Sequence, residues 1–311
     1  MDYREEWVRT KNDQGDNMQR DRNDRKSVMM FVLSMLIFGT IGIFRRYIPI
    51  SSAYLAFSRG VLGGLFLLSF MKLKQRDVGE KLPAHTAIWL AVTGAVMGVN
   101  WILLFEAYNH TTVSIATLCY YMQPTIVVLL SPIFFKEKLT MKKCVCASAA
   151  IVGMALVSGV TGGEGAKSGD LTGILLGLGA AIFYSAVVIM NKRIIGIDAY
   201  QKTTIQLFSS GIIMIPYMLL KGGFAGEGFS MITVILLLIV GIVHTGIAYV
   251  LYFGSMDGMK AQSVAILSYI DPVSALLFSA LLLKEPLNTI DAIGAIMIIG
   301  SAVISEIQID F

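Results

Sequence analysis

The chain has 311 residues, of which 55% are hydrophobic and only 15% charged, and its mean hydropathy is +0.70. A soluble protein of this length ordinarily needs more polar surface for its domains. Because a transmembrane helix takes about 20 apolar residues, about ten such helices fit the chain and no large soluble domain does. The net charge of +4 balances 25 Lys and Arg against 21 Asp and Glu. In such a chain it reports membrane orientation and not binding of nucleic acid.

The N-terminal segment differs sharply from the rest. Its first 26 residues contain seven Lys or Arg and seven Asp or Glu, a composition that predicts a disordered tail over residues 1–27. The apolar run after Ser27 ends at Phe44 without a small-residue cleavage site. It is therefore expected to remain as the first membrane span and not to be removed as a signal peptide.

Apolar segments separated by short polar breaks predict an all-α integral membrane protein with ten transmembrane helices. The predicted spans are residues 28–44, 53–71, 87–107, 113–135, 144–160, 171–190, 204–220, 231–253, 261–283 and 289–305. Lengths of 17 to 23 residues favour helices over barrel strands, which run about 10 residues with strict alternation.

Basic residues gather on one side of these spans. The tail, the loops at 72–86, 136–143 and 191–203, and Lys260 together contain 19 Lys or Arg, whereas the opposite side contains 5. By the positive-inside rule, both termini are expected in the cytoplasm of a multi-pass protein of the cell (inner) membrane.

The chain also contains an internal repeat. Residues 98–139 align with residues 246–287 at a constant offset of 148, with ten identities in 42 positions. The identical pairs are Gly98/Gly246, Leu103/Leu251, Phe105/Phe253, Tyr121/Tyr269, Pro124/Pro272, Leu129/Leu277, Ser131/Ser279, Lys136/Lys284, Glu137/Glu285 and Leu139/Leu287. Since five spans per half is an odd number, the halves have opposite topology. We predict two inverted repeats, residues 28–160 and 171–307, joined by an external linker at 161–170.

Inverted repeats are typical of secondary transporters, whose substrate sites lie near the membrane midplane at interrupted helices. Pro124 and Pro272 occupy equivalent positions in the fourth and ninth spans. Each removes a backbone donor, so we expect helix kinks there. The kinks either mark the binding site or are packing features whose broken turns are satisfied by nearby polar side chains.

Ionisable side chains within the spans are candidates for function, because burying them in a bilayer is costly. Arg59 and Glu106 are expected in the outer third of the membrane. They would form a structural ion pair or an outer gate, or contact substrate directly. His244 and Asp271 are expected near the midplane, where a carboxylate and an imidazole can bind a cation, an amine or a proton. A satisfied histidine on a polar helix face is the alternative for His244.

The loop after the fourth span repeats after the ninth. Thr140 is predicted to be the N-cap of the fifth span, with Glu137 close to the same positive helix end. A structural role is the better interpretation of both residues.

The chain shows no sign of catalysis, a cofactor or a metal site. HExxH, GxSxG and Walker A motifs are absent, and Cys119, Cys144 and Cys146 are poorly spaced for a metal. Transport would therefore draw its energy from a gradient. A membrane-embedded enzyme or a sensor subunit is the rival hypothesis, but the three histidines are far apart in the sequence.

These motifs resemble the EamA-type branch of the drug/metabolite transporter superfamily. The matching stretches are Phe38-Gly39, Ala56-Phe57-Ser58-Arg59, Asn100 to Tyr108, Ser114 to Leu118, Tyr121-Met122-Gln123-Pro124 with Lys136-Glu137, and Ser268 to Pro272 with Lys284-Glu285. The resemblance implies an inner-membrane carrier of small metabolites that works by alternating access. It also implies a cavity lined by spans 1, 3, 4, 6, 8 and 9, substrates that include amino acids, and frequent export.

Together these observations predict a secondary transporter that exports a small polar or amphipathic metabolite. The expected substrate-binding residues are Trp101, Tyr120, Gln123, His244, Tyr249, Ser268 and Asp271. Asp271 is expected to bind charge or couple transport to protons, and the pair Arg59 and Glu106 to form the gate. An uncoupled facilitator is the alternative within transport. The expected partners are the substrate and the lipid bilayer, and both a monomer and a homodimer fit the sequence.

Overall fold

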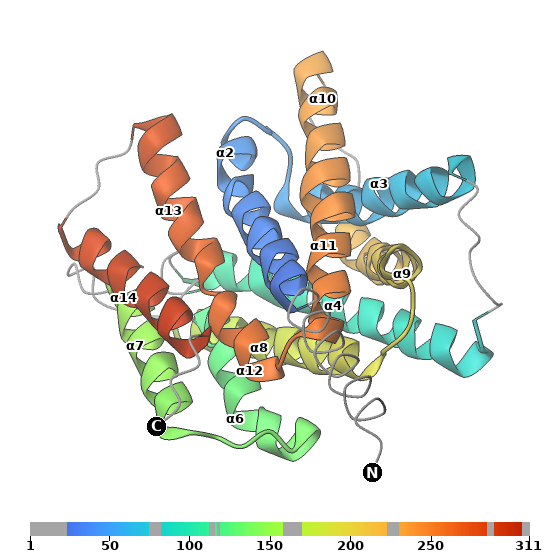
Figure 1. The fold of residues 1–311 in the computed structure, drawn as a ribbon. Coiled ribbons are helices and arrows are strands. Elements are labelled where there is room, and N and C mark those ends of the chain that lie inside the picture. The colour runs from blue at the N-terminus through green and yellow to red at the C-terminus, as the bar shows by residue number, and fades with distance from the viewer. Residues whose placement is uncertain are drawn as a thin grey trace, which may run out of the picture.

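The structure is a computed structural model that describes residues 24–74, 82–111, 116, 119–157, 170–222, 230–284 and 289–306. In these residues the regular structure is helical (Figure 1). The predicted tail lies outside the described residues up to residue 23, and the predicted linker does so up to residue 169.

Ten helical segments account for the ten predicted spans. The first runs from Asp24 to Phe44, with a turn at Thr40. The helices after that turn are α2 (Ile41–Arg46), α3 (Ser52–Leu73), α4 (Ala84–His110), α6 (Gln123–Phe135), α7 (Met141–Val157), α8 (Asp170–Arg193), α9 (Ala199–Leu220), α10 (Met231–Ile239), η2 (Val240–Ile247), α11 (Ala248–Ser255), η3 (Met256–Gly258), α12 (Ala261–Leu267), α13 (Ile270–Leu283) and α14 (Thr289–Glu306). In the described part, seven segments are long and apolar enough to cross a bilayer, as a multi-pass membrane protein requires.

The repeat seen in the sequence extends over the whole fold. Adding 148 to the bounds of α3, α4, α6 and α7 gives those of α9, the α10–η3 segment, α13 and α14 to within a residue or two. Lys136 and Lys284, one offset apart, both end their helices in the left-handed conformation, with φ of 57° and 56°. The prediction of two inverted five-helix repeats is confirmed.

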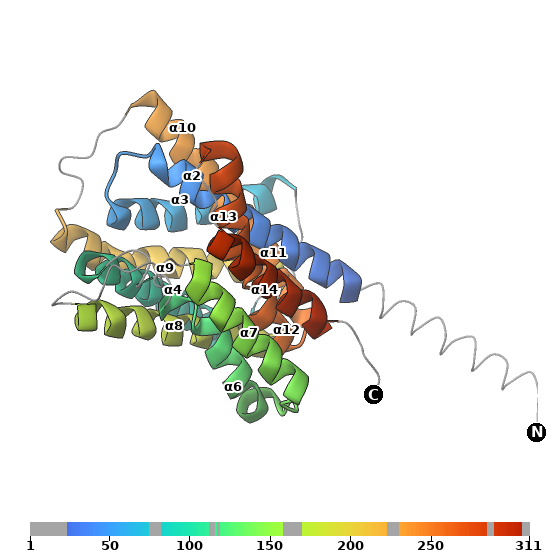
Figure 2. The same ribbon diagram turned by 90° about the vertical axis from the view of Figure 1, so that its left-hand side faces the viewer.

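Helix packing follows the same symmetry. Helix α4 packs on α9, and their counterparts η2 and α3 pack on each other. Likewise α6 packs on α8, while α13 packs on α2 at the end of the first segment. The last helices of the two repeats, α7 and α14, lie side by side (Figures 1 and 2). These interfaces between the repeats therefore occur twice or lie on the pseudo-twofold axis.

The structure sharpens the prediction of kinks. The fourth span turns at Tyr121 and Met122 before α6 begins, and the ninth turns at Ser268 and Tyr269 between α12 and α13. Both helices are thus broken just before the proline, which then lies in the first turn of the following helix. Proline is tolerated there because the first amides of a helix have no intrahelical partner.

The eighth span contains a feature that its apolar pattern does not reveal. Its middle part, η2, is a π-helix that includes His244, between α10 and α11. The equivalent residues of α4 are α-helical. Because π-helical turns are rare and concentrate at functional sites, this local departure from symmetry draws attention to His244 and its neighbours.

Close approach of α4 and α9 depends on Gly94. A Cβ atom added there would lie 2.7 Å from the Cα atom of Gln206 and would also clash with its carbonyl oxygen. Small residues allow membrane helices to come this close.

We expect Gly94→Ala to destabilise the protein by about 1–3 kcal/mol, because the added methyl group meets backbone and not a flexible side chain. Thermal unfolding of the purified protein in detergent would measure the change. Gly42→Ala is the matched control, since nothing lies within 4 Å of a Cβ atom at that position. Equal melting temperatures for the two variants would contradict this packing.

Candidate functional site

The two broken helices contact each other through their tyrosines. The Tyr121 hydroxyl, at the break in the fourth span, donates to Asp271 Oδ2 in α13 at 3.1 Å. The hydroxyl of Tyr269, at the break in the ninth span, lies 3.0 Å from Thr125 Oγ1 in α6. Tyr121 and Tyr269 are equivalent in the repeat, but their partners are not, because Asp271 corresponds to Gln123 and Thr125 to Val273.

Polar groups surround these breaks. Gln123 is 2% exposed, its carbonyl accepts a hydrogen bond from Ser185 Oγ at 3.1 Å, and its side-chain Nε2 has no hydrogen-bond partner. Ser268 Oγ donates to the Val264 carbonyl at 2.7 Å. A buried donor without a partner is costly, so the Gln123 amide is a group that a ligand would satisfy.

Aromatic rings form a belt between the two halves. Trp101 and Tyr249, which are equivalent in the repeat, have ring centroids 6.3 Å apart. Tyr184 stacks on Tyr120 with centroids 5.5 Å apart and donates to the hydroxyl of Tyr252 at 3.1 Å. Successive contacts join six rings, which we call the aromatic belt: Trp101, Tyr249, Tyr252, Tyr184, Tyr120 and Tyr121.

Arg59 lies at one end of this belt. Its guanidinium carbon is 5.5 Å from the centre of the Trp101 ring, a cation–π geometry, and its Nε donates to Thr245 Oγ1 at 3.0 Å. Thr245 in turn donates to the Val240 carbonyl inside the π-helix. The π-helix thus presents a hydroxyl to a cation that has no carboxylate partner among the residues that the structure describes.

Asp271 lies at the other end, where Tyr121 is its hydrogen-bond donor. The aromatic belt links the two residues, since Arg59 lies over its first ring, Trp101, and Asp271 accepts from its last, Tyr121. The two charges therefore stand at opposite ends of one aromatic surface. Such an arrangement can hold a molecule that carries an anionic and a cationic group.

The predicted ion pair between Arg59 and Glu106 does not form. Glu106 Oε1 pairs with Lys221 Nζ at 2.7 Å. On α4, Glu106 is five residues beyond Trp101, on which Arg59 rests, and this places it about 7.5 Å farther along the helix axis. At that level the end of α9 supplies Lys221, so depth along α4 decides the partner.

His244 is buried at 2% exposure. Its Nε2 lies 2.8 Å from Thr40 Oγ1, at the turn in the first helix, and its ring centroid is 4.7 Å from that of Phe44. The side chain therefore joins the first helix to the π-helix, one residue from Thr245.

The binding residues expected from the sequence do not include Tyr121, Tyr184, Tyr252 and Thr245. Tyr184 and Tyr252 belong to spans 6 and 8, which the family resemblance already places at the cavity. Tyr121 adjoins the Gln123-Pro124 pair, so its position next to a helix break was a usable signal. Nothing in the sequence marks Thr245, because its role depends on the π-helix.

A second polar cluster joins the repeats at the ends of α6, α8 and α9, next to the basic loops. The Glu137 carboxylate accepts from the backbone amides of Ala261 and Gln262 at 2.8 and 3.2 Å. It therefore caps α12 and not the helix after its own loop, which was the expectation. Thr140 does cap that helix, since its hydroxyl accepts from the Lys143 amide at 3.3 Å.

The same cluster buries a lysine that the sequence placed in a loop. Lys202 is 1% exposed and forms an ion pair with Asp257 at 3.5 Å. Lys192 Nζ donates to the Met256 carbonyl at 2.9 Å. We call Glu137, Lys192, Lys202, Asp257 and Gln262 the end cluster. Its bonds tie the ends of helices from both repeats together on this face.

Comparison with known proteins relates this architecture to a protein family. The EamA-like transporter family matches the chain twice, over residues 25–159 and 171–306. The chain belongs to this family. The two matched segments contain the two broken helices, with Tyr121 in the first and Asp271 in the second.

Related EamA-like proteins align over most of the chain. "Uncharacterized transporter YxxF" of Bacillus subtilis is 28% identical over 282 residues, which is 91% of this chain and 90% of that protein. An "Uncharacterized transporter" of Archaeoglobus fulgidus is 27% identical, covering 88% of this chain and 94% of that protein. "Protein PecM" of Dickeya dadantii is 25% identical, covering 74% and 77%.

The fold is shared with a protein whose crystal structure is known. It superposes with a TM-score of 0.80 at 18% identity, covering 91% of this chain and 99% of that chain. Family membership and the helical architecture together make the chain a multi-pass membrane transporter.

The end cluster yields a test of this EamA-like protein's motion. Glu137→Gln weakens a charge-assisted cap of about 1 kcal/mol on α12, so the ends should separate about fivefold more often. The readout is labelling of a cysteine at Ser263, which is 6% exposed, by a membrane-impermeant maleimide, with the three native cysteines replaced by serine.

Lys138→Gln is the control. It removes a charge from the same loop, and the Lys138 side chain is exposed and does not touch α12. Faster labelling in both variants, or in neither, would show that the Glu137 cap does not hold this face closed.

Proposed function

We propose that this protein is an alternating-access carrier that exports a zwitterionic metabolite of the amino-acid type across the cell membrane. The substrate carboxylate binds Arg59, the ammonium binds Asp271, and the apolar part lies against the aromatic belt. Both termini lie in the cytoplasm, as the distribution of Lys and Arg supports.

The observation that carries this proposal is the pair of separated charges. Arg59 donates to the Thr245 hydroxyl and lies over the indole ring of Trp101. Asp271 accepts a hydrogen bond from the phenol of Tyr121. Leaving a charge in a membrane interior without a counter-ion is costly. A ligand that brings a carboxylate to one and an ammonium to the other removes both costs at once.

Alternating access is supported by the reciprocal packing of the repeats. The site lies at the two helix breaks, near the pseudo-twofold axis, where inverted-repeat transporters place their substrates. The end cluster closes the basic face. Rocking one repeat against the other would break that cluster and open the site to the cytoplasm.

Proton coupling follows from Asp271 if one carboxylate serves two cations in turn. Release of the substrate ammonium leaves an unpaired carboxylate in the membrane, and a proton neutralises it for the return step. Export of substrate would then be accompanied by proton entry. An uncoupled facilitator would move substrate with no change in luminal pH of proteoliposomes.

The first test uses Asp271→Asn, which keeps the shape of the side chain but removes its charge. Loss of a charge-assisted hydrogen bond of about 1.5–3 kcal/mol should weaken binding of amines roughly ten- to a hundredfold. The readout is the thermal stability of the purified protein with a panel of amino acids, matched carboxylic acids that lack the amine, and matched amines that lack the carboxylate.

A ligand that binds only the folded state raises its stability with occupancy. Asp271→Asn should lose the stabilisation by amines and keep that by carboxylic acids, and its transport in proteoliposomes should lose its pH dependence. Unchanged stabilisation by amines, or unchanged pH dependence, would refute the role of Asp271.

The second test exchanges the other charge. Arg59→Gln should lose stabilisation by carboxylic acids on the same panel and keep that by amines, because the guanidinium is the proposed carboxylate site. Arg59→Lys is the control that keeps the charge without the planar fork and should bind with intermediate affinity. A ligand preference that is the same in all three proteins would overturn the proposed orientation of the substrate.

A further inference from the structure

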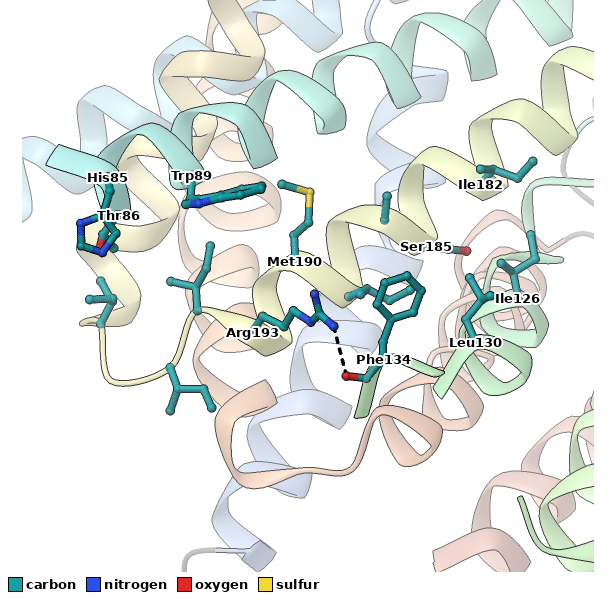
Figure 3. Close-up of a pocket in the computed structure, with 15 residues that line it drawn as sticks. His85, Thr86, Trp89, Ile126, Leu130, Phe134, Ile182, Ser185, Met190 and Arg193 are labelled. Carbon is teal, nitrogen blue, oxygen red and sulfur yellow. Dashed lines mark hydrogen bonds between the residues drawn. The ribbon is translucent and has the colours of Figure 1, made fainter. Parts of the chain in front are cut away.

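A groove of about 660 Å³ lies between the start of α4, the length of α6 and the second half of α8. Figure 3 shows Ile126 and Ile182 at one end of it, Phe134, Met190 and Arg193 farther along, and His85 and Thr86 at the other end. Its volume falls in the range of small-molecule sites. Of the residues named for the central site only Ser185, which donates to the Gln123 carbonyl, also lines the groove, so the groove adjoins that site but is separate from it.

The wall of this groove is apolar and faces outward. Ile182 is 57% exposed, Trp89 56% and Ile195 70%. These residues belong to membrane-spanning segments or adjoin one, where exposed aliphatic surface is covered by lipid chains. The lining of the groove includes no Asp or Glu.

Arg193 supplies a fixed cation in the groove. The guanidinium carbon of Arg193 lies 4.9 Å from the centre of the Phe134 ring, and its Nη2 donates to the Phe134 carbonyl at 3.3 Å. This hydrogen bond, drawn as a dashed line in Figure 3, uses one of the five guanidinium donors. The remaining donors suit the planar, bidentate recognition of a phosphate.

The part of the groove from Ile182 to Arg193 matches one leaflet of a bilayer. From Ile182 to Arg193, α8 advances about 17 Å, close to half of the roughly 30 Å hydrocarbon core. The Arg193 end lies beside the basic loops, which is the cytoplasmic side in the orientation proposed above. Anionic lipids give that leaflet a negative surface potential.

We propose that this groove binds an anionic glycerophospholipid, with its phosphate on Arg193 and an acyl chain along α6 and α8. The assignment to the cytoplasmic leaflet depends on the proposed orientation, whereas binding itself does not depend on which substrate the carrier moves. Ser185 in the groove wall also donates to the carbonyl of Gln123. A bound chain would therefore press on the wall that supports the central site.

The test is a lipid titration of the purified full-length protein in detergent, followed by native mass spectrometry. Phosphatidylglycerol and phosphatidylcholine with identical short acyl chains are compared. The folded protein should bind phosphatidylglycerol more tightly, and Arg193→Gln should weaken that binding about fivefold, the effect of about one interfacial basic residue, and remove the preference. Equal binding of the two lipids by the unaltered protein would overturn the proposal.

Three further measurements separate the sources of such an effect. Lys72 is an exposed basic residue at the end of α3. Lys72→Gln should leave the preference for phosphatidylglycerol intact, and loss of the preference in this variant would indicate a general surface-charge effect. Inorganic phosphate should not displace the lipid, since it lacks the chain. Ala186→Phe fills the groove and should weaken binding of both lipids, whereas unchanged binding would place the lipid elsewhere and refute the site.

Discussion

In a bilayer core, an interrupted helix has no water to satisfy its backbone, so every freed amide and carbonyl must find a partner within the protein. This chain interrupts two helices at one level, at Tyr121–Met122 and Ser268–Tyr269. Short local bonds repair both breaks, where the Met122 amide donates to the Cys119 carbonyl and the Asp271 amide to the Ser268 carbonyl, each at 3.2 Å. Next to the first break, the Ser185 hydroxyl also donates to the Gln123 carbonyl. Polar side chains are therefore concentrated at the centre because the breaks require them, and a substrate can use the same groups.

The breaks also link the repeats. Tyr121 reaches Asp271 and Tyr269 reaches Thr125, so each half presents its tyrosine to the other half's second helix piece. A relative rotation of the repeats must exchange these weak bonds as well as the stronger contacts of the end cluster. Hydrogen bonds contribute only about 1 kcal/mol each in net terms, so a ligand of moderate affinity suffices to shift the balance between two arrangements.

Much of the fold could be predicted, because the ten spans depend on apolar length and the repeat on identities such as Tyr121/Tyr269. The partners of charged groups were harder to predict. Glu106 pairs with Lys221 and not with Arg59, since a difference in depth of little more than one helical turn decides the contact. Glu137 caps α12 across the repeat boundary, a tertiary contact that no local pattern encodes. The π-helix at His244 likewise has no counterpart in the equivalent sequence of α4.

The backbone is nearly symmetric, whereas the charges are not. The repeat equivalent of Arg59 is Leu207, and that of Asp271 is Gln123. A scaffold with two matching halves thus has a site with a cation at one end and a carboxylate at the other. Symmetry of the helices allows the site to face either side of the membrane with similar packing. Asymmetry of the charges would select one orientation of the proposed dipolar ligand in both states, because the reversed orientation would bring like charges together.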